Sequence, residues 1–343
     1  MKILGYCFIF FTAANAFGWG GRGHDTICQA AVKLIKNKEL RLYFEVRPHV
    51  MGHLCNIPDT QWRDLAPEQT ALGGPTHYVD ADMFGTDFLS LPTDYQELVT
   101  KFQGKPSAHK NMPVKSIATE FGSNWWRADQ FHRRAIEALK ANDQYGFMVN
   151  LGLMGHFVGD NAQPLHLTVN YDGYLTGHGG LHAFYEEDVV GALGPKLLYD
   201  VFHEGERLLN DFQKTRKTKK TFSNTDFLRA ETTIEKMRGL GILSFADLKE
   251  LFKLDKIESP SQSRLEKGMD IKTPAVRKAP ELVAKSFERL IVKEMGRASA
   301  LLAVLWDEAY EKAGSPALVS GNSKRSKYPL SVEFVAPDYL PTK

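Results

Sequence analysis

The sequence predicts an all-α fold, a single-domain helical bundle with long loops and an irregular C-terminal tail. Apolar residues recur at helical spacing along most of the chain, and no convincing series of alternating strands accompanies them. Hydrophobic residues make up 43% of the 343 residues, which is enough for a sizeable core in one large domain. We therefore expect that neither metals nor disulfides are needed merely to hold the fold together.

Apolar stripes and capping residues locate the individual helices. The first is expected over residues 25–46, with Asp25 as its N-cap. A helix opened by Asp143 and running to about Asp160 is apolar nearly all round, so we expect it at the centre of the bundle. The other helices are expected over residues 124–142, from Pro195 toward Phe212, over residues 225–238 and 244–254, and within 280–313.

Two stretches are expected to lack helices. Residues 255–279 are rich in Ser, Pro, Lys and Asp, a composition that predicts a long surface loop. The last thirty residues show no periodic pattern and are expected to be irregular or extended.

The N-terminus is typical of a secretory signal peptide. A lysine is followed by an apolar run over residues 3–11 and then by small residues. Cleavage fits two points, after Ala16 or after Gly18, and the second would make Trp19 the new N-terminus. We expect cleavage after Gly18 and a secreted or periplasmic protein. The expected parts of the chain are a signal peptide (1–18), a helical domain (19–313) and a C-terminal tail (314–343).

Charge and cysteine content narrow the possibilities further. The chain has 43 basic and 41 acidic residues, and this balance argues against a broad nucleic-acid-binding surface. Two cysteines lie outside the predicted signal, Cys28 and Cys55. In an oxidising compartment they could form one disulfide, and two buried free thiols are the alternative.

Histidines and carboxylates occur at spacings that suit a metal site. His156 and Asp160 are four residues apart on the predicted central helix, so both project from one face. The Gln-Pro-Leu step then ends that helix and brings His166 within reach. His182 and Glu186 repeat the four-residue spacing after a glycine-rich connection. Nitrogen and oxygen ligands without thiolates suit catalytic zinc, which keeps open positions for water and substrate.

Asp59, His77 and the opening Trp19-Gly-Gly-Arg-Gly-His24 extend this set. In order and spacing, the residues resemble the superfamily that joins zinc-dependent single-strand-specific nucleases with zinc-dependent phospholipases C. The resemblance runs from Trp19 to about residue 190 and implies three Zn²⁺ ions. It implies one ion held by Asp59, His77, His156 and Asp160, a second held by the amine and carbonyl of Trp19 with His24 and Asp160, and a third held by His166, His182 and Glu186. At the third ion, His178 or Glu187 could replace a neighbour.

The resemblance also implies a reaction, in-line attack on phosphorus by a hydroxide shared between the paired zinc ions. Asp59 would orient this nucleophile or accept its proton. Arg63 would neutralise transition-state charge on the phosphoryl oxygens, and its alternative is a surface arginine near Asp64. The chain is therefore expected to be a zinc-dependent hydrolase that cleaves phosphodiester bonds.

Residues near His77 favour the nuclease branch. The resemblance implies that Tyr78 stacks on a base and that Asp80 hydrogen-bonds this base, whereas the alternative leaves Tyr78 in the core and Asp80 capping a turn. The expected activity is endonucleolytic cleavage of single-stranded DNA or RNA to products with 5′-phosphates. Glu186 instead matches the phospholipase pattern, so phosphatidylcholine-type lipids are the alternative substrate. A non-catalytic secreted zinc-binding protein is a lesser alternative, and no stable protein partner is expected.

Overall fold

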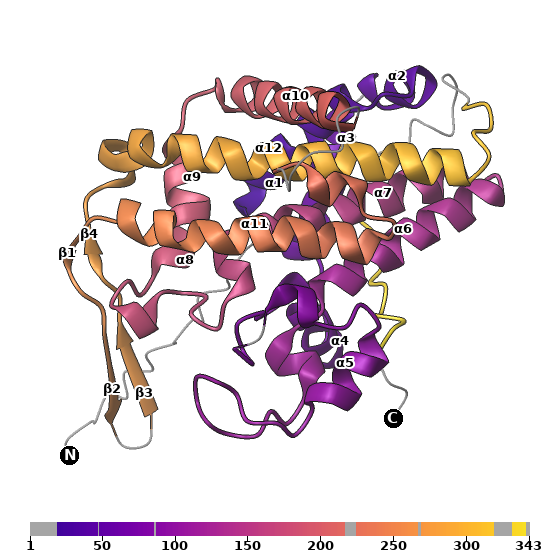
Figure 1. Ribbon diagram of the computed structural model, residues 1–343. Coiled ribbons are helices and arrows are strands. Elements are labelled where there is room, and N and C mark those ends of the chain that lie inside the picture. The colour runs from indigo at the N-terminus through magenta and orange to yellow at the C-terminus, as the bar shows by residue number, and fades with distance from the viewer. Residues whose placement is uncertain are drawn as a thin grey trace, which may run out of the picture.

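The computed structural model describes residues 19–46, 48–85, 87–216, 224–266, 269–318 and 331–340. The predicted signal peptide lies outside these residues. Helices dominate the described part of the chain (Figure 1), which confirms the all-α fold. The longer helices are α1 (Gly20–Leu34), α2 (Lys38–Glu45), α3 (Pro48–Thr60), α4 (Pro67–Gly73), α5 (Tyr95–Phe102), α6 (Asn124–Lys140), α7 (Gln144–Asn161), α10 (Leu197–Arg216), α11 (Thr233–Leu254) and α12 (Pro280–Lys312).

Short helical segments connect them. They are η1 (Gly74–His77), η2 (Phe88–Ser90), η3 (Ile117–Phe121), η4 (Pro164–Leu167), η5 (Tyr174–Thr176), α8 (Leu181–Ala183), η6 (Phe184–Val189), α9 (Val190–Ala192) and η7 (Asp226–Arg229). Of these, α8, η6 and α9 follow one another without a break, and η6 is a π-helical turn.

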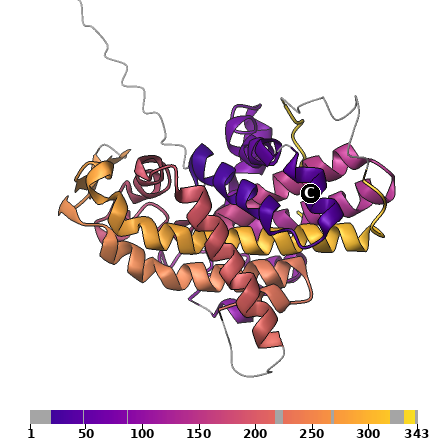
Figure 2. The same ribbon diagram turned by 90° about the horizontal axis from the view of Figure 1, so that it is seen from above.

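Helix α7 lies at the centre of the bundle, as its composition predicts. The Asp143 carboxylate caps its first turn by accepting a hydrogen bond of 2.8 Å from the Gly146 amide. Most residues from Phe147 to Asn161 are buried, because α1, α3, α6 and α12 pack around this helix. In Figure 1, α12 lies between α10 and α11, and Figure 2 shows α10 crossing α12.

Glycines on α7 let α1 and α3 approach it closely. A β-carbon at Gly155 would lie 2.5 Å from the Cys28 sulfur and 2.6 Å from the Cys55 sulfur. A β-carbon at Gly152 would lie 2.3 Å from the Cβ atom of Leu54, so larger residues would push the helices apart. Cys28 of α1 and Cys55 of α3 form a disulfide beside Gly155. Of the two alternatives for these cysteines, the disulfide is therefore the one observed.

The first predicted helix, over residues 25–46, is in fact two helices. Helix α1 begins at Gly20, and its N-cap residue is Trp19 rather than Asp25. The chain leaves helical geometry after α1, and Asn37 then opens α2 by accepting a hydrogen bond from a backbone amide. The predicted boundary was wrong because the Trp-Gly-Gly opening gives no helical signal.

Helix α11 is longer than the sequence predicts. Residues 225–238 and 244–254 are predicted as separate helices, but α11 begins at a capping box formed by Thr232 and Glu235 and runs without a break to Leu254. The first residues of the predicted helix 225–238 form the short helix η7 instead. Leu240, in the join, is buried against the rest of the core. Packing therefore sustains the helix where its sequence pattern weakens.

The predicted surface loop 255–279 contains four short strands: β1 (Ile257–Ser259), β2 (Gln262–Glu266), β3 (Met269–Thr273) and β4 (Val276–Arg277). β1 pairs with β4 and β2 with β3, both antiparallel, and Figure 1 shows them projecting from the helical body. Every residue of β2 is exposed, so the alternating apolar pattern that reveals most strands is missing here. We call residues 255–279 the strand arm.

The described parts of the C-terminal tail, residues 314–318 and 331–340, contain no helix or strand, as expected. They are nevertheless anchored to the core. The carbonyls of residues 332, 335 and 336 accept hydrogen bonds from the side chains of Trp62, Arg127 and Gln130. Within the described residues, no helix has the length and apolar character needed to cross a membrane.

Candidate metal centre

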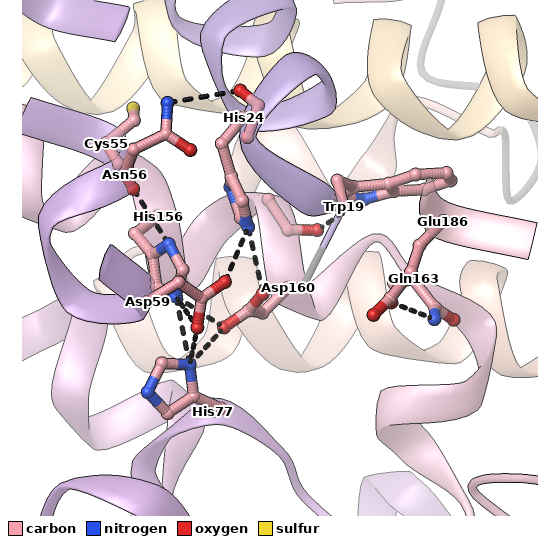
Figure 3. Close-up of polar contacts among 12 residues, drawn as sticks. Trp19, His24, Cys55, Asn56, Asp59, His77, His156, Asp160, Gln163 and Glu186 are labelled. Carbon is pink, nitrogen blue, oxygen red and sulfur yellow. Dashed lines mark hydrogen bonds and ion pairs between the residues drawn. The ribbon is translucent and has the colours of Figure 1, made fainter. Parts of the chain in front are cut away.

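Five buried side chains converge between α1, α3, η1 and α7, and we call them the helix cluster: His24, Asp59, His77, His156 and Asp160. His156 and Asp160 lie one turn apart on α7 and face the same side (Figure 3). The His156 Nε2 atom is 3.1 Å from an Asp160 oxygen and 2.9 Å from the His77 Nδ1 atom. The His24 Nε2 atom is 3.3 Å from the other Asp160 oxygen and 3.9 Å from Asp59.

Three further buried side chains form what we call the loop cluster: His166, His182 and Glu186. His166 lies on η4, directly after α7, whereas His182 and Glu186 lie on α8 and on the π turn η6. The Nε2 atoms of the two histidines are 3.0 Å apart. The Glu186 Oε2 atom is 2.9 Å from the Nε2 atom of His182 and 3.8 Å from that of His166.

Asp160 connects the two clusters, because its Oδ1 atom also lies 3.8 Å from the Nδ1 atom of His166. The described part of the chain contains three groups of potential metal ligands, and within each group the ligand atoms lie within 4.8 Å of one another. The groups are His24, His156 and Asp160; Asp59, His77 and His156; and the loop cluster. Together they contain every side chain that the sequence predicts as a metal ligand apart from Trp19. His156 belongs to two of these groups, whereas the resemblance assigns it to one ion.

Backbone carbonyls orient three of the histidines. The Nδ1 atom of His156 lies 2.8 Å from the Cys55 carbonyl oxygen, and that of His182 lies 2.9 Å from the Tyr171 carbonyl oxygen. The Nδ1 atom of His166 lies 2.7 Å from the carbonyl oxygen of His77. Each contact leaves Nε2 directed at its cluster. Histidine ligands of metals commonly have one ring nitrogen held in this way while the other binds the ion.

Burial favours the neutral form of three imidazoles, those of His24, His77 and His182. Burial lowers the pKa of His77 and of His182 to about 4 in each case. Burial, together with the neighbouring His156, also lowers the pKa of His24. At His156 burial acts in the same direction, but Asp160 and Asp59 outweigh it and raise the pKa.

The carboxylates of the two clusters differ in their ionisation. Burial opposes ionisation of Asp59, but His156 and Arg63 outweigh it and hold its pKa at about 2. Burial likewise opposes ionisation of Asp160, and the surrounding histidines hold its pKa well below the usual value. At Glu186 burial prevails and raises the pKa well above the usual value. Metal ligands must be deprotonated, so Asp59 and Asp160 already have the required state, whereas Glu186 would release a proton when a metal ion binds.

Several buried atoms have no hydrogen-bond partner within the described residues. They include both ring nitrogens of His24, the Oδ1 atom of Asp160 and the Oε1 atom of Glu186. Buried polar atoms without a partner are costly and therefore rare. His24, Asp160 and Glu186 all belong to groups whose ligand atoms converge, and a cation bound there could satisfy the Nε2 atom of His24 and the two carboxylate oxygens. The Nδ1 atom of His24 lies on the other side of its ring, toward Gly159. The residues present therefore fit bound metal ions.

In Figure 3, Trp19 lies between His24 of the helix cluster and Glu186 of the loop cluster. Its indole nitrogen donates a hydrogen bond of 2.8 Å to the Gly159 carbonyl of α7, and its ring lies 5.4 Å from that of Tyr185. Gly20 follows with a φ of +57°, and a β-carbon there would lie 3.2 Å from the Glu186 carbonyl oxygen. Only glycine suits this conformation at so close an approach. The role predicted for the amine and carbonyl of Trp19 remains a prediction.

Arg63 lies at the edge of the helix cluster and is partly exposed. Its Nη2 atom is 2.7 Å from an Asp59 oxygen, so its position is set by a predicted metal ligand. A pocket of about 60 Å³ is lined by Arg63, His77 and Trp62, among others. This space could hold water next to the predicted catalytic residues.

Tyr78 and Asp80 directly follow η1. The Tyr78 hydroxyl donates a hydrogen bond of 2.8 Å to the Thr119 carbonyl, and burial raises the pKa of this hydroxyl. Asp80 is half-buried, and burial together with Asp82 raises the pKa of its carboxyl group well above the usual value. The backbone amides of residues 79 and 81 donate hydrogen bonds to the carbonyls of His166 and Leu167, so Tyr78 and Asp80 lie on a segment paired with the one that carries His166.

Sequence reasoning missed the residues that support the ligands. The Gln163 amide donates a hydrogen bond of 2.9 Å to Glu186, and the Asn124 amide donates one of 3.3 Å to the His77 carbonyl. The two suggested substitutes at the third ion do not join the loop cluster, because His178 bonds to Asp255 and Glu187 is exposed. Gln163 and Asn124 lie far from their partners in sequence, so no local spacing marks them.

No protein-family model and no curated protein matches the chain.

Proposed function

We propose that this protein is a secreted zinc-dependent phosphodiesterase that cleaves single-stranded nucleic acid endonucleolytically and leaves 5′-phosphates. The observation that carries the proposal is the convergence of eight buried histidine and carboxylate side chains on three adjacent groups joined by Asp160. Imidazole and carboxylate ligands without thiolates suit zinc at a catalytic site. The Cys28–Cys55 disulfide supports secretion, because such bonds persist in oxidising compartments.

Zinc bound at such a centre supplies positive charge for phosphoryl oxygens and lowers the pKa of a bound water toward about 7. The side chains around it then have separate tasks. Asp59 is anionic, and its carboxylate can accept a hydrogen bond from the attacking water and orient it. Arg63, held against Asp59 at the edge of the cluster, is positioned to meet the negative charge that develops on the phosphoryl oxygens.

A lysine-bearing loop supports a polyanionic substrate. The segment between α5 and η3 carries Lys105, Lys110 and Lys115, all exposed, and none of them forms an ion pair with a described carboxylate. This segment is attached near Tyr78 and Asp80, since the Ala108 amide donates a hydrogen bond of 2.7 Å to the carbonyl of residue 83. Lysines beside the centre could contact phosphates that flank the cleaved bond.

The test is to purify the secreted protein, measure its bound zinc, and compare its cleavage of single-stranded DNA, RNA, double-stranded DNA and phosphatidylcholine. We expect three zinc ions per chain and chelator-sensitive cleavage of the single-stranded polymers. A matched variant, Lys105→Gln with Lys110→Gln and Lys115→Gln, should weaken binding of long oligonucleotides. It should also reduce the salt dependence of binding, by a slope of about 0.7 for each phosphate that a lysine no longer neutralises. Full zinc loading without cleavage of any diester would refute the enzymatic proposal.

A phospholipase C activity is the second candidate. Tyr171 and Leu175, on the segment that leads into the loop cluster, are 48% and 66% exposed. Apolar side chains at the edge of a phosphodiesterase site could enter a lipid surface. Hydrolysis of phosphatidylcholine without cleavage of nucleic acid would establish this alternative. Zinc binding without any hydrolysis would leave the third candidate, a non-catalytic zinc-binding protein.

A further inference from the structure

The segment that leads into the loop cluster is hydrogen-bonded to the strand arm at Gly177 and Gly179. Residues 173–180 contain four glycines, and three of them have left-handed backbone angles, so the segment has little conformational preference of its own. The Gly177 carbonyl accepts a hydrogen bond of 2.8 Å from the Ser261 amide. The Gly179 amide donates one of 2.9 Å to the Ser261 hydroxyl, and its carbonyl accepts one of 2.9 Å from the Ala275 amide.

Asp255 lies at the centre of these contacts. It is the C-cap residue of α11 and is only 4% exposed. One carboxylate oxygen lies 2.8 Å from the His178 Nδ1 atom, and the two oxygens accept hydrogen bonds of 2.8 Å from the Nε and Nη2 atoms of Arg277. A two-point bond between a guanidinium and a buried carboxylate fixes both groups in direction as well as in distance.

Arg277 extends the contact to the cluster itself. Its Nη1 atom donates a hydrogen bond of 3.0 Å to the Gly179 carbonyl, and its Nη2 atom donates one to the His178 carbonyl. Its guanidinium lies 5.2 Å from the centre of the Phe184 ring. Phe184 stands between His182 and Glu186 in sequence, so Arg277 touches both the glycine segment and the helical segment that carries two ligands.

We propose that Asp255 and Arg277 are positioning residues that hold His182 and Glu186 in place, so that the strand arm sets the metal affinity of the loop cluster. This inference rests on the proposed metal centre. The arm links the end of the long helix α11 to the second half of the glycine segment, directly before the helical turns that carry His182 and Glu186. The ligands of the helix cluster are held by α1, α3, η1 and α7 instead, so their metal affinity should not depend on Asp255 or Arg277.

The variants Asp255→Asn and Arg277→Lys test the proposal. Asp255→Asn removes the charge, whereas Arg277→Lys keeps the charge but cannot form the two-point bond. Glu258→Gln and Arg264→Gln are matched controls, because both residues are exposed and lie on the same arm. Zinc content is measured after equilibration at fixed free zinc, and helix content by circular dichroism.

We expect three zinc ions in the wild type and in both controls. In each variant one ion should bind about 10–100-fold more weakly, while the other two ions and the helix content stay unchanged. Three ions bound with wild-type affinity in both variants would overturn the role of the arm and leave the metal centre intact. Loss of all three ions with the helix content would also overturn it, because the residues would then serve folding in general. Fewer than three ions in the wild type would instead refute the metal centre as proposed.

Discussion

The helix cluster and the loop cluster differ in how their ligands are held. In the helix cluster, His24, Asp59, His156 and Asp160 lie on three long helices, two of which are joined by a disulfide. In the loop cluster, His182 and Glu186 lie on short helical turns that follow a glycine-rich segment, and His166 lies on the short helix η4 that precedes this segment. The first cluster is therefore fixed by the core of the bundle, whereas the second depends on contacts with the strand arm.

The difference is between ligands whose positions follow from a long helix and ligands whose positions depend on contacts with another part of the chain. Residues on one helix face keep their spacing as long as the helix exists. A segment with several glycines has many conformations available in the absence of external contacts, and ordering it is costly. We therefore expect the two clusters to respond differently to perturbation.

The largest effect is expected from Asp160→Asn, because the carboxylate of Asp160 lies close to histidines of both clusters. Its two oxygens lie within 4 Å of His24, His77, His156 and His166. The variant should lose more than the 10–100-fold in activity that removal of an outer hydrogen-bond partner causes, and its zinc content should fall by more than one ion. Hydrolysis assays and zinc analysis would measure both.

Asp129→Asn is the matched control, since Asp129 pairs with Arg133 near the surface of α6. It should change neither property. Retention of three zinc ions by Asp160→Asn would show that the two clusters are independent, contrary to the geometry.

The next largest effect is expected from stepwise removal of the metal ions, which should distinguish the two clusters by their affinities. As a chelator is titrated, one ion should leave before the other two, and we assign this ion to the loop cluster. At a free zinc concentration of about 1,000 times Kd, each bound ion contributes about 4 kcal/mol to the free energy of unfolding. The melting temperature should therefore fall once when the first ion leaves and again when the other two leave.

Two variants identify the early ion. Glu186→Gln should abolish the early step, whereas His77→Gln should preserve it, because these residues belong to different clusters. If His77→Gln abolishes the early step instead, the helix cluster is the weaker site and the comparison is reversed.

A smaller effect is expected from overpacking the helix cluster. A β-carbon at Gly159 would lie 2.8 Å from the His24 Nδ1 atom. Gly159→Ala should therefore displace His24 at a cost of about 1–3 kcal/mol and weaken metal binding in the helix cluster alone. Gly191→Ala is the control, because a β-carbon there meets no atom within 4 Å among the described residues. Equal zinc affinity in the two variants would contradict the tight packing of His24 on α7.

The metal ligands of both clusters could be predicted from the sequence more completely than the residues that support them. The four-residue spacing of His156 and Asp160 follows from the helix period, and the apolar character of their helix predicts its burial. His182 and Glu186 were found by the same spacing, although their helix contains a π turn. The resemblance supplied Asp59 and His77, which no local pattern would have selected.

The supports of the loop cluster could not be predicted in this way. Asp255 and Arg277 lie 77 and 99 residues from His178 in sequence, and their contacts arise only in the folded chain. Most of the strand arm is polar and exposed, so it resembles a loop in composition. Long-range contacts of charged residues leave no periodic signal, whereas helix faces do.

The last expected effect is on the pH dependence of stability, and it should be similar for His77 in the helix cluster and His182 in the loop cluster. Burial lowers the pKa of His77 and of His182 to about 4, from a usual value of 6.5. Between these values the unfolded chain binds a proton that the folded chain does not, so metal-free protein loses stability as the pH falls from 6.5 toward 4. Each histidine should account for about 1.4 kcal/mol per pH unit, or about 2 kcal/mol between about pH 7 and about pH 5. His77→Gln and His182→Gln should each reduce the loss by that amount in urea unfolding at the two pH values. A reduction confined to His77→Gln would mean that the loop cluster opens to water without metal, which would sharpen the contrast between the clusters.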